Sequence, residues 1–236
     1  MRLAARFVAG AMLAGGVISA SLAQPPAATN AAATQAEVSF HIERSGLPVP
    51  KFTLRVREDG TGSYRAEEVE GPSDRGTVRY AEARHIDRTL NLTSDTVTRI
   101  FKAARELKYF DVDCASRAKN IADTGEKTLS YSGADGKGSC VYNYSENKLV
   151  RMLTGDFLSI AETLDEGRRL AYLHRYDRLG LDAETIALEQ AAAAGRATEF
   201  GTIAPVLSSI AGDPAVMERV RLRVARLLER AGANKI

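Results

Sequence analysis

Two segments, which begin at residues 38 and 52, alternate apolar and polar residues. Apolar side chains occupy every second position over 38–42 and again over 52–56. A period of two places them all on one face of an extended strand, so each segment predicts a strand with one buried face. Asp59-Gly60 then offers a tight turn into a further strand at 63–66. Strands joined by tight turns pair antiparallel, and the sequence therefore predicts an antiparallel sheet with one face to be covered.

A helix is predicted to follow, because apolar residues recur there at helical spacing. Thr93 or Ser94 can cap its N-terminus, and Asp95 suits its first turn. Its apolar stripe consists of Val97, Ile100, Phe101, Ala104 and Leu107. Such a stripe must cover a sheet face or another helix.

Further elements up to residue 176 follow from the same patterns. They are two short extended segments (78–81 and 88–92), a hairpin whose strands (128–132 and 139–144) flank a loop at 133–138, and a long helix at 147–176. The polar stretch 67–76 is typical of a loop. Gly155 and Gly167 are points at which the long helix could be interrupted.

The composition changes near residue 178. Of the 15 Phe and Tyr residues, only Phe200 lies beyond position 177. We therefore expect an α+β fold, with an antiparallel sheet covered by helices at 37–177 and an all-helical appendage at 178–236.

The appendage is expected to contain three short helices. Residues 183–197 are rich in alanine, and Pro205 is expected to start the next helix. Asp213-Pro214 is typical of the cap and first turn of the last helix.

The first 23 residues have the layout of an export signal. Arg2 and Arg6 give a positive start, an uncharged apolar stretch follows at 7–20, and small residues precede a cleavage site after Ala23. The apolar stretch is shorter than the roughly 20 residues that span a bilayer. We therefore expect an exported protein, periplasmic or extracellular, without a transmembrane span in the mature chain. Residues 24–36 carry no charge and no large apolar side chain, which predicts a flexible leader.

The charge balance excludes one large class of function. The chain has 32 Lys and Arg, and once Arg2 and Arg6 are discounted, 30 remain against 30 Asp and Glu. General nucleic-acid binding needs a concentrated positive field, which this balance does not supply. Two Cys and three scattered His argue against a dedicated zinc site, and no cofactor is expected.

The two cysteines, Cys114 and Cys140, are expected to form a disulfide. Export would place them in an oxidising compartment, where two thiols of one chain commonly pair. The alternative is a pair of free buried thiols.

Four short stretches of the chain resemble a domain of unknown function found in exported bacterial proteins. They are Val56–Tyr64 (VREDGTGSY), Lys108–Asp111 (KYFD), Asp123–Gly125 (DTG) and Lys127–Tyr131 (KTLSY). The resemblance covers residues 37–177. It implies a small sheet covered by helices in an exported protein, and it carries no activity or binding residues that could be transferred.

Two motifs resemble catalytic loops and favour a structural interpretation. Asp123-Thr124-Gly125 is similar to the aspartic protease loop, but it occurs once, and 126–127 depart from the protease pattern. A turn before the following strand is the preferred interpretation. The glycine spacing at 133–139 does not match a phosphate-binding loop, and a strand is expected after it instead of a helix.

The remaining candidate ligands and bases are dispersed. Asp111, Asp113, Asp123 and Asp135 match no calcium-loop spacing. His41, His85 and His174 lie on different predicted elements. The sequence therefore predicts no metal site and no catalytic residue.

The last helix carries the most organised polar pattern. Its packing stripe is Val216, Val220, Val224, Leu227 and Ala231. Arg219, Arg223, Arg226 and Arg230 form a second stripe beside it. These arginines could form a face for an anionic partner, such as lipid headgroups, cell-wall polymer or an acidic protein. A solvated flank whose arginine stems cover apolar surface is the alternative that we favour.

These patterns favour an exported, non-catalytic binding or interaction module of the periplasm or cell envelope. Its partner would be an envelope protein or polymer. The alternative is an exported hydrolase with an irregular site that contains carboxylates. Convergence of Asp111, Asp123 or Asp135 in a deep pocket would favour the hydrolase.

Overall fold

A computed structural model describes residues 35–47, 49–69 and 84–233. The predicted export signal, most of the predicted leader and the predicted strand at 78–81 lie outside the described residues. Ala36, which we expected to end the leader, is buried, and its carbonyl accepts a hydrogen bond from the N–H of Glu58. The fold therefore includes this residue.

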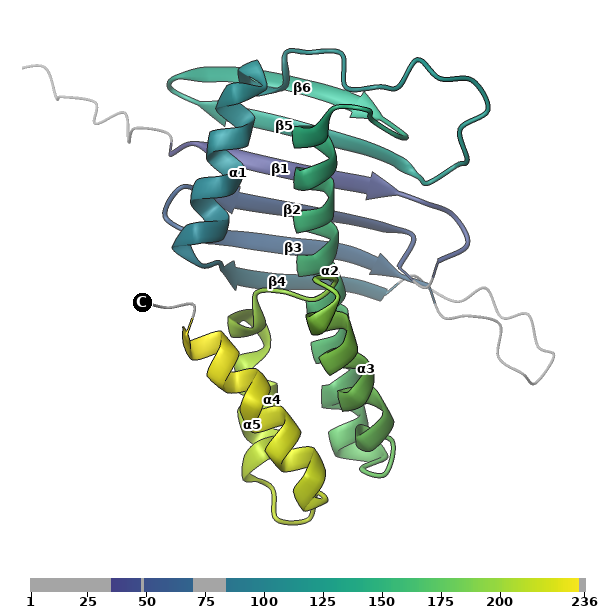
Figure 1. The fold of residues 1–236 in the computed structure, drawn as a ribbon, viewed down its shortest axis with the longest axis vertical. Coiled ribbons are helices and arrows are strands. Elements are labelled where there is room, and N and C mark those ends of the chain that lie inside the picture. Colours follow the sequence, from purple (N-terminus) through teal and green to yellow (C-terminus); the bar gives the residue numbers. More distant parts are fainter. Residues whose placement is uncertain (1–34, 48, 70–83, 234–236) are drawn as a thin grey trace, which may run out of the picture. The chain divides into compact units, whose positions relative to one another are not determined.

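The described strands form one antiparallel sheet of six strands, ordered β4-β3-β2-β1-β5-β6 (Figure 1). The strands are β1 (Glu37–Glu43), β2 (Lys51–Arg57), β3 (Thr61–Glu68), β4 (Arg84–Asn91), β5 (Glu126–Gly133) and β6 (Gly136–Tyr142). Phe40 of β1 stands opposite Leu54 and Leu129 on the neighbouring strands, and all three side chains are fully buried. The apolar residues of the alternating segments thus lie on one face of the sheet, as predicted.

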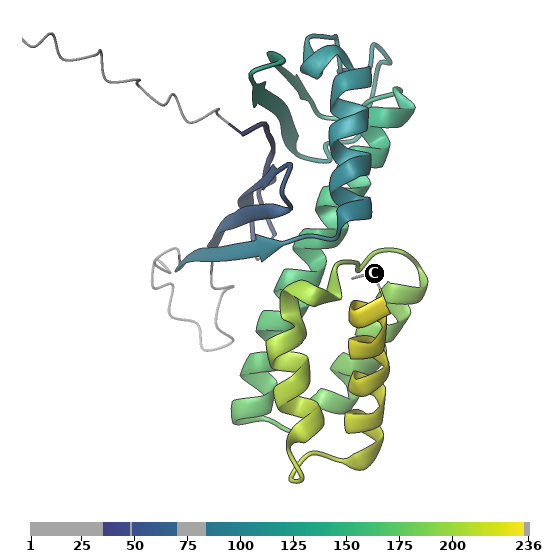
Figure 2. The ribbon, with the colours of Figure 1, turned by 90° about the vertical axis from the view of Figure 1, so that its left-hand side faces the viewer.

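Two helices lie on this buried face of the sheet, α1 (Ser94–Glu106) and α2 (Lys148–Tyr176) (Figures 1 and 2). All five residues of the stripe predicted for α1 are buried. The Phe157 ring of α2 stacks on Phe40, with ring centroids 5.1 Å apart. The α+β fold predicted from the sequence is confirmed.

The chain after α2 is helical. It comprises α3 (Leu181–Ala193), a 3₁₀ turn η2 (Phe200–Ile203), α4 (Ala204–Gly212) and α5 (Glu218–Ala233). These elements share a second hydrophobic cluster, which also contains Leu170 of α2, and the partly buried Leu173 packs against it. Because α2 contributes to both clusters, the two hydrophobic cores share one helix. The domain boundary expected at 177 lies at the end of this shared helix. The independent folding of residues 37–177 stays a prediction.

Several predicted boundaries were wrong, among them the start of β4 at Arg84 instead of 88, and two of them have an evident cause. The last helix begins at Glu218, because the Asp213 carboxylate accepts the Ala215 N–H (2.9 Å) and forms a turn before the helix. The hairpin loop is shorter than 133–138, because Gly133 and Gly136 already pair across the strands. The packing stripe predicted for the last helix is nevertheless buried throughout.

Helix α2 runs through Gly155 and Gly167 without interruption. Because both glycines lie in the same helix, their substitution compares the packing at two positions. A Cβ at Gly155 would meet nothing within 4 Å, whereas a Cβ at Gly167 would lie 2.3 Å from Cγ2 of Ile203. Gly155→Ala is expected to raise the free energy of unfolding by about 0.5–1 kcal/mol, because alanine loses less backbone entropy. Gly167→Ala is expected to lower it by about 1–3 kcal/mol through overpacking. Denaturant titration of both variants checks the opposite signs, and stabilisation by Gly167→Ala would contradict the close approach of α2 to η2.

Candidate functional site

The predicted disulfide between Cys114 and Cys140 is present, with the two Cα atoms 5.8 Å apart and both residues buried. It joins the segment after α1 to β6, an edge strand of the sheet. The same segment is held further along, where the Ser116 N–H donates to the Tyr144 carbonyl (2.8 Å). Residues 108–110 within this segment all have positive φ, an uncommon backbone for residues other than glycine. The disulfide therefore anchors an irregular segment against a strand edge that would otherwise be open.

The tripeptide at 123–125 is a turn, as we preferred. The Asp123 carboxylate accepts the Gly125 N–H (2.9 Å), and the Asp123 side chain is exposed. The buried ammonium of Lys127 donates to three oxygens of Thr124 and Gly125 and to the Asn143 carbonyl, at 2.8–3.0 Å. Burial lowers the pKa of Lys127, and the nearby Arg44 lowers it further. The loop thus serves to bind an ammonium group of the same chain.

The aspartates that could have formed a hydrolase site occupy separate positions. Asp135 accepts hydrogen bonds from the Tyr131 hydroxyl (2.5 Å) and from Nε of Arg105 (2.9 Å), and both lower the pKa of Asp135. Asp113 pairs with Arg117 and accepts the Ala115 N–H. Within the described ranges, no three His, Cys, Asp or Glu side chains are grouped so that they could hold a metal ion. These carboxylates act in local turns and ion pairs.

The three histidines are also apart. Nδ1 of His41 lies 2.8 Å from the Thr53 hydroxyl on the open face of the sheet, and His85 is exposed on β4. Nε2 of His174 lies 2.8 Å from the Asp213 carboxylate at the end of α4. His41 also lies 3.6 Å from Glu43, which pairs with Lys51, and Asp213 also pairs with Arg178, so these histidines belong to separate ion-pair groups in different parts of the fold.

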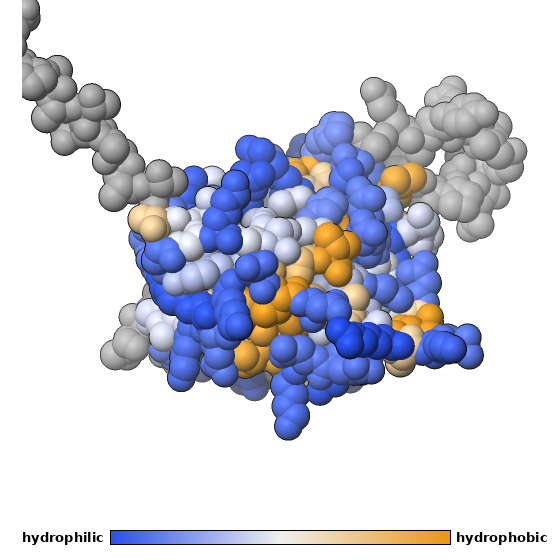
Figure 3. Space-filling view, turned by 90° about the horizontal axis from the view of Figure 1, so that it is seen from above, coloured by the Kyte–Doolittle hydropathy of each residue, from blue (hydrophilic) through white to orange (hydrophobic). Residues whose placement is uncertain are grey.

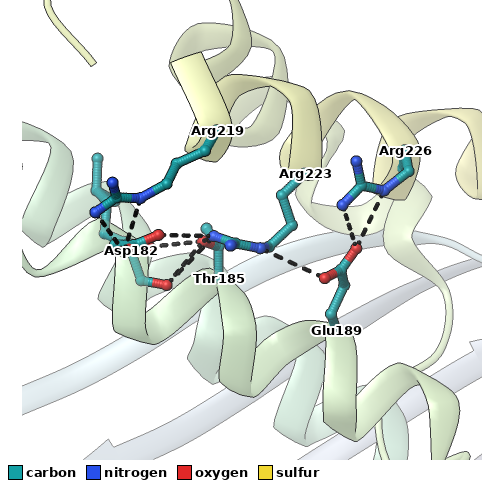
Figure 4. A network of polar contacts seen from close by, with 7 residues as sticks. Asp182, Thr185, Glu189, Arg219, Arg223 and Arg226 are labelled. Carbon is teal, nitrogen blue, oxygen red and sulfur yellow. Dashed lines mark hydrogen bonds and ion pairs between the residues drawn. The ribbon is translucent and has the colours of Figure 1, made fainter. Parts of the chain in front are cut away.

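The arginine stripe of α5 faces α3, and carboxylates of the same chain bind three of its four members (Figure 4). Arg219 and Arg223 both bind Asp182, and hydrogen bonds from these two lower the pKa of that carboxyl. Arg226 binds Glu189 at 3.0 Å. Arg219 and Arg226 nevertheless stay 64% and 58% exposed, which agrees with the solvated flank that we favoured, whereas Arg223 is only 13% exposed. The anionic-partner face stays a prediction, with three of its four arginines already paired.

The fourth arginine of the stripe, Arg230, is exposed and has no ion pair among the residues that the structure describes. A single arginine does not make an anionic-partner face. The stripe therefore fixes α5 against α3, and the sequence could not show this because it depends on which helices are neighbours.

A carboxylate that the sequence gave no reason to select joins the tail to α1. The Glu199 side chain is buried and accepts the Thr93 N–H (2.9 Å), the Thr93 hydroxyl (2.7 Å) and the Thr96 hydroxyl (2.5 Å). Thr93 is the N-cap of α1, but its own side chain caps no backbone N–H. Glu199 therefore places a negative charge at the N-terminus of α1, where the helix dipole favours it.

Two facing glutamates make the packing of α2 on α3 sensitive to pH. Burial, together with a hydrogen bond that protonated Glu166 donates to Glu184, raises the pKa of Glu166 from its ordinary 4.5 to about 7, while Arg169 opposes the rise and Glu162 adds to it. The folded state therefore retains this proton to higher pH than the unfolded state does. The free energy of unfolding should consequently fall as pH rises from about 4.5 to about 7.

Glu166→Gln is expected to flatten this fall and to raise the free energy of unfolding at pH 8 by about 1 kcal/mol. Denaturant titrations at pH 5, 6, 7 and 8 measure both effects. Glu106→Gln, an exposed glutamate at the end of α1, is the matched control and should keep the wild-type pH profile. A wild-type profile for Glu166→Gln would contradict the shared proton.

The most unusual part of the described surface lies where α2 ends and α3 begins. Of ten large hydrophobic side chains that are exposed, four fall within residues 172–186, including the three most exposed. They are Tyr172 (61% exposed), Tyr176 (65%), Leu179 (79%) and Ile186 (39%). We call these four residues the α2–α3 corner.

The two tyrosines of the α2–α3 corner lie side by side, with ring centroids 5.0 Å apart. The guanidinium of Arg175 lies over the Tyr176 ring, 5.2 Å from its centroid. These residues do not stand out in the sequence, although 172, 176 and 179 have helical spacing. In the sequence they look like a packing stripe, because apolar residues at helical spacing form the same pattern whether they are buried or exposed.

The face on the β6 side differs in character. The view in Figure 3, from the β6 side, shows a largely hydrophilic surface with a hydrophobic area among charged side chains. Val141 is the exposed large apolar residue of β6, and Tyr144 follows this strand. Among the described residues, no helix is both long enough and apolar enough to cross a bilayer.

Comparisons with known proteins add no relative. The sequence matches no family model, and no curated protein matches it.

Proposed function

We propose that this chain is an exported, non-catalytic interaction module of the cell envelope, and that it binds a partner protein through the α2–α3 corner. The observation that supports this is the exposure of Tyr172, Tyr176 and Leu179, which are 61%, 65% and 79% accessible. Single exposed apolar residues are ordinary, but a group of them commonly marks an interaction site.

The chemistry of the corner suits a protein partner. Tyrosine and arginine are enriched among the residues that dominate protein interfaces, because they combine large contact area with polar groups. Arg175 and the two tyrosines supply this combination, and Leu179 and Ile186 add aliphatic surface. The partner that fits is therefore a protein with an apolar groove and an acceptor for the guanidinium.

The expected location rests on the predicted export signal at residues 1–23 and agrees with the disulfide. Disulfides persist mainly in oxidising compartments, so Cys114–Cys140 is compatible with export. Cell fractionation followed by mass analysis of the N-terminus checks this part of the proposal, with Gln24 expected as the first residue.

A capture experiment tests the binding surface. Residues 24–236 are immobilised and exposed to envelope extract, in parallel with a Tyr176→Ser/Leu179→Ser variant. Leu222→Ser is the matched control, because Leu222 is also a highly exposed apolar residue (55%) but lies on α5. We expect the wild type and the control to retain the same protein, and the corner variant to retain at least about tenfold less of it.

Three results would contradict the proposal. Equal retention by all three chains would show that the corner is not the binding surface. Retention of a polysaccharide instead of a protein would redirect the proposal to a cell-wall polymer. Hydrolysis of an envelope substrate by the wild-type chain would favour the hydrolase alternative.

A further inference from the structure

The size of the α2–α3 corner limits the kind of contact that it can make. Its four exposed side chains present on the order of 500 Å² of surface, comparable to the largest apolar patch of many monomeric proteins. A partner that covers this surface with an equal area of its own would bury about 1,000 Å² in total, at the lower limit for specific interfaces. The corner therefore suits a weak and reversible contact.

Two charged residues of the corner differ from their neighbours. Arg175 and Asp177 stand on either side of Tyr176 in the sequence, and both are exposed. The Asp177 carboxylate accepts the Gly180 N–H (3.2 Å), and no ion pair within the described ranges includes Arg175 or Asp177. The other charged side chains at 170–190 are held in ion pairs of the same chain, namely His174, Arg178, Asp182, Glu184 and Glu189. Among the residues described, the corner thus carries one unpaired charge of each sign.

An apolar surface with one unpaired charge of each sign is complementary to itself. In a two-fold symmetric contact the same surface occurs on both subunits, so that each residue meets its counterpart across the axis in a reciprocal way. Arg175 can then pair with Asp177 of the partner subunit, and Asp177 with the partner's Arg175. Because Tyr176 lies between the two charges, this pairing places it near the partner's Tyr176, where two aromatic rings add to the contact.

We propose that the partner of the α2–α3 corner is a second copy of this chain, in a weak two-fold dimer. This inference rests on the proposed function and names the partner of the same surface. The apolar side chains of the corner supply the contact area, and the reciprocal pairs of Arg175 with Asp177 fix the orientation of the two copies. Charges in an interface set specificity in this way, because juxtaposed like charges are costly.

Sedimentation velocity on a chain of residues 24–236, from about 1 to about 500 µM, tests the dimer. We expect a reversible dimer with a dissociation constant on the order of 10–100 µM, as suits a small interface. Tyr176→Ser/Leu179→Ser should dimerise at least about tenfold more weakly. Leu222→Ser is again the matched control and should dimerise like the wild type, because Leu222 is 55% exposed but lies on α5.

An exchange of charges tests the two-fold pairing itself. Arg175→Asp leaves two acidic side chains in each copy and Asp177→Arg leaves two basic ones, so each variant alone should dimerise at least about tenfold more weakly than the wild type. An equimolar mixture of the two variants should dimerise like the wild type, because every pair then joins opposite charges. Thermal unfolding verifies that the variants are folded. Asp177→Asn, which keeps an acceptor for the Gly180 N–H, is a milder variant that should also weaken the dimer.

Three results overturn the inference. They are a wild type that stays monomeric at about 500 µM, equal dimerisation of Tyr176→Ser/Leu179→Ser, and a mixture of folded charge variants that stays monomeric. The proposed function is judged separately, by capture from envelope extract. A monomeric chain that captures another protein through the corner would refute the dimer and leave the proposed function standing.

Discussion

Replacement of both Cys114 and Cys140 by alanine is expected to lower the free energy of unfolding by about 3.5 kcal/mol. The disulfide closes a loop of 26 residues, and in the chain-entropy account most of its effect comes from restricting the unfolded chain. The folded state adds to the effect, because the bridge holds the segment after α1 against the edge strand β6. Guanidinium chloride titration of the variant and the wild type measures the difference.

The reducing agent provides the control for this experiment. Wild-type protein titrated in reductant should match the double-alanine variant, whereas the variant itself should not respond to reductant. Alkylation without reductant under denaturing conditions should modify no cysteine of the wild type. A double variant within about 1 kcal/mol of the oxidised wild type would show that hydrogen bonds alone, such as that from Ser116, hold the segment.

Local periodicity made much of the fold predictable. Alternation at 38–42 and 52–56 indicated which strand faces are buried, and the stripe of α1 indicated what covers them. These signals are strong because burial of one face leaves a repeat in the sequence. The order β4-β3-β2-β1-β5-β6 has no comparable signal, because the pairing of β1 with β5 joins segments that are distant along the chain.

The beginning of α5 shows how a side chain can override a local signal. Asp213-Pro214 has the composition of a helix start, but the Asp213 carboxylate also pairs with His174 on α2. Hydrogen bonds that the Asp213 carboxylate accepts from the Ala215 N–H and from His174 lower the pKa of Asp213, so the charged form is favoured in this turn. The helix therefore starts four residues later than the dipeptide suggests, at Glu218.

The candidate sites were less predictable than the fold, for a related reason. The spacing of Arg219, Arg223 and Arg226 was evident in the sequence, but their function depends on Asp182 and Glu189 of a neighbouring helix. A pattern of charged residues in the sequence indicates that these side chains need partners of opposite charge, but it does not identify the partners. The α2–α3 corner was missed for the opposite reason, since apolar residues at helical spacing predict burial.

Glu199→Ala is expected to lower the free energy of unfolding by about 3 kcal/mol. The substitution leaves the N–H of Thr93 and the hydroxyls of Thr93 and Thr96 without their acceptor in a buried place. It also removes the negative charge from the N-terminus of α1. The bonded threonines are more than 100 residues earlier in the chain, so this carboxylate connects the helical tail to the helix that covers the sheet. A chain that ends at 177 would lack this carboxylate together with most of the second hydrophobic cluster, so only the point substitution isolates its contribution.

The backbone of Glu199 allows a sharper test. Its φ is +56°, in the left-handed region that glycine adopts readily. Glu199→Gly should therefore be about 1 kcal/mol less destabilising than Glu199→Ala, although both lose the same carboxylate. Glu229→Ala, an exposed glutamate on α5, is the matched control and should stay within about 0.5 kcal/mol of the wild type. If Glu199→Ala also stays within about 1 kcal/mol, water replaces the carboxylate at the start of α1, and packing alone connects the tail to the sheet.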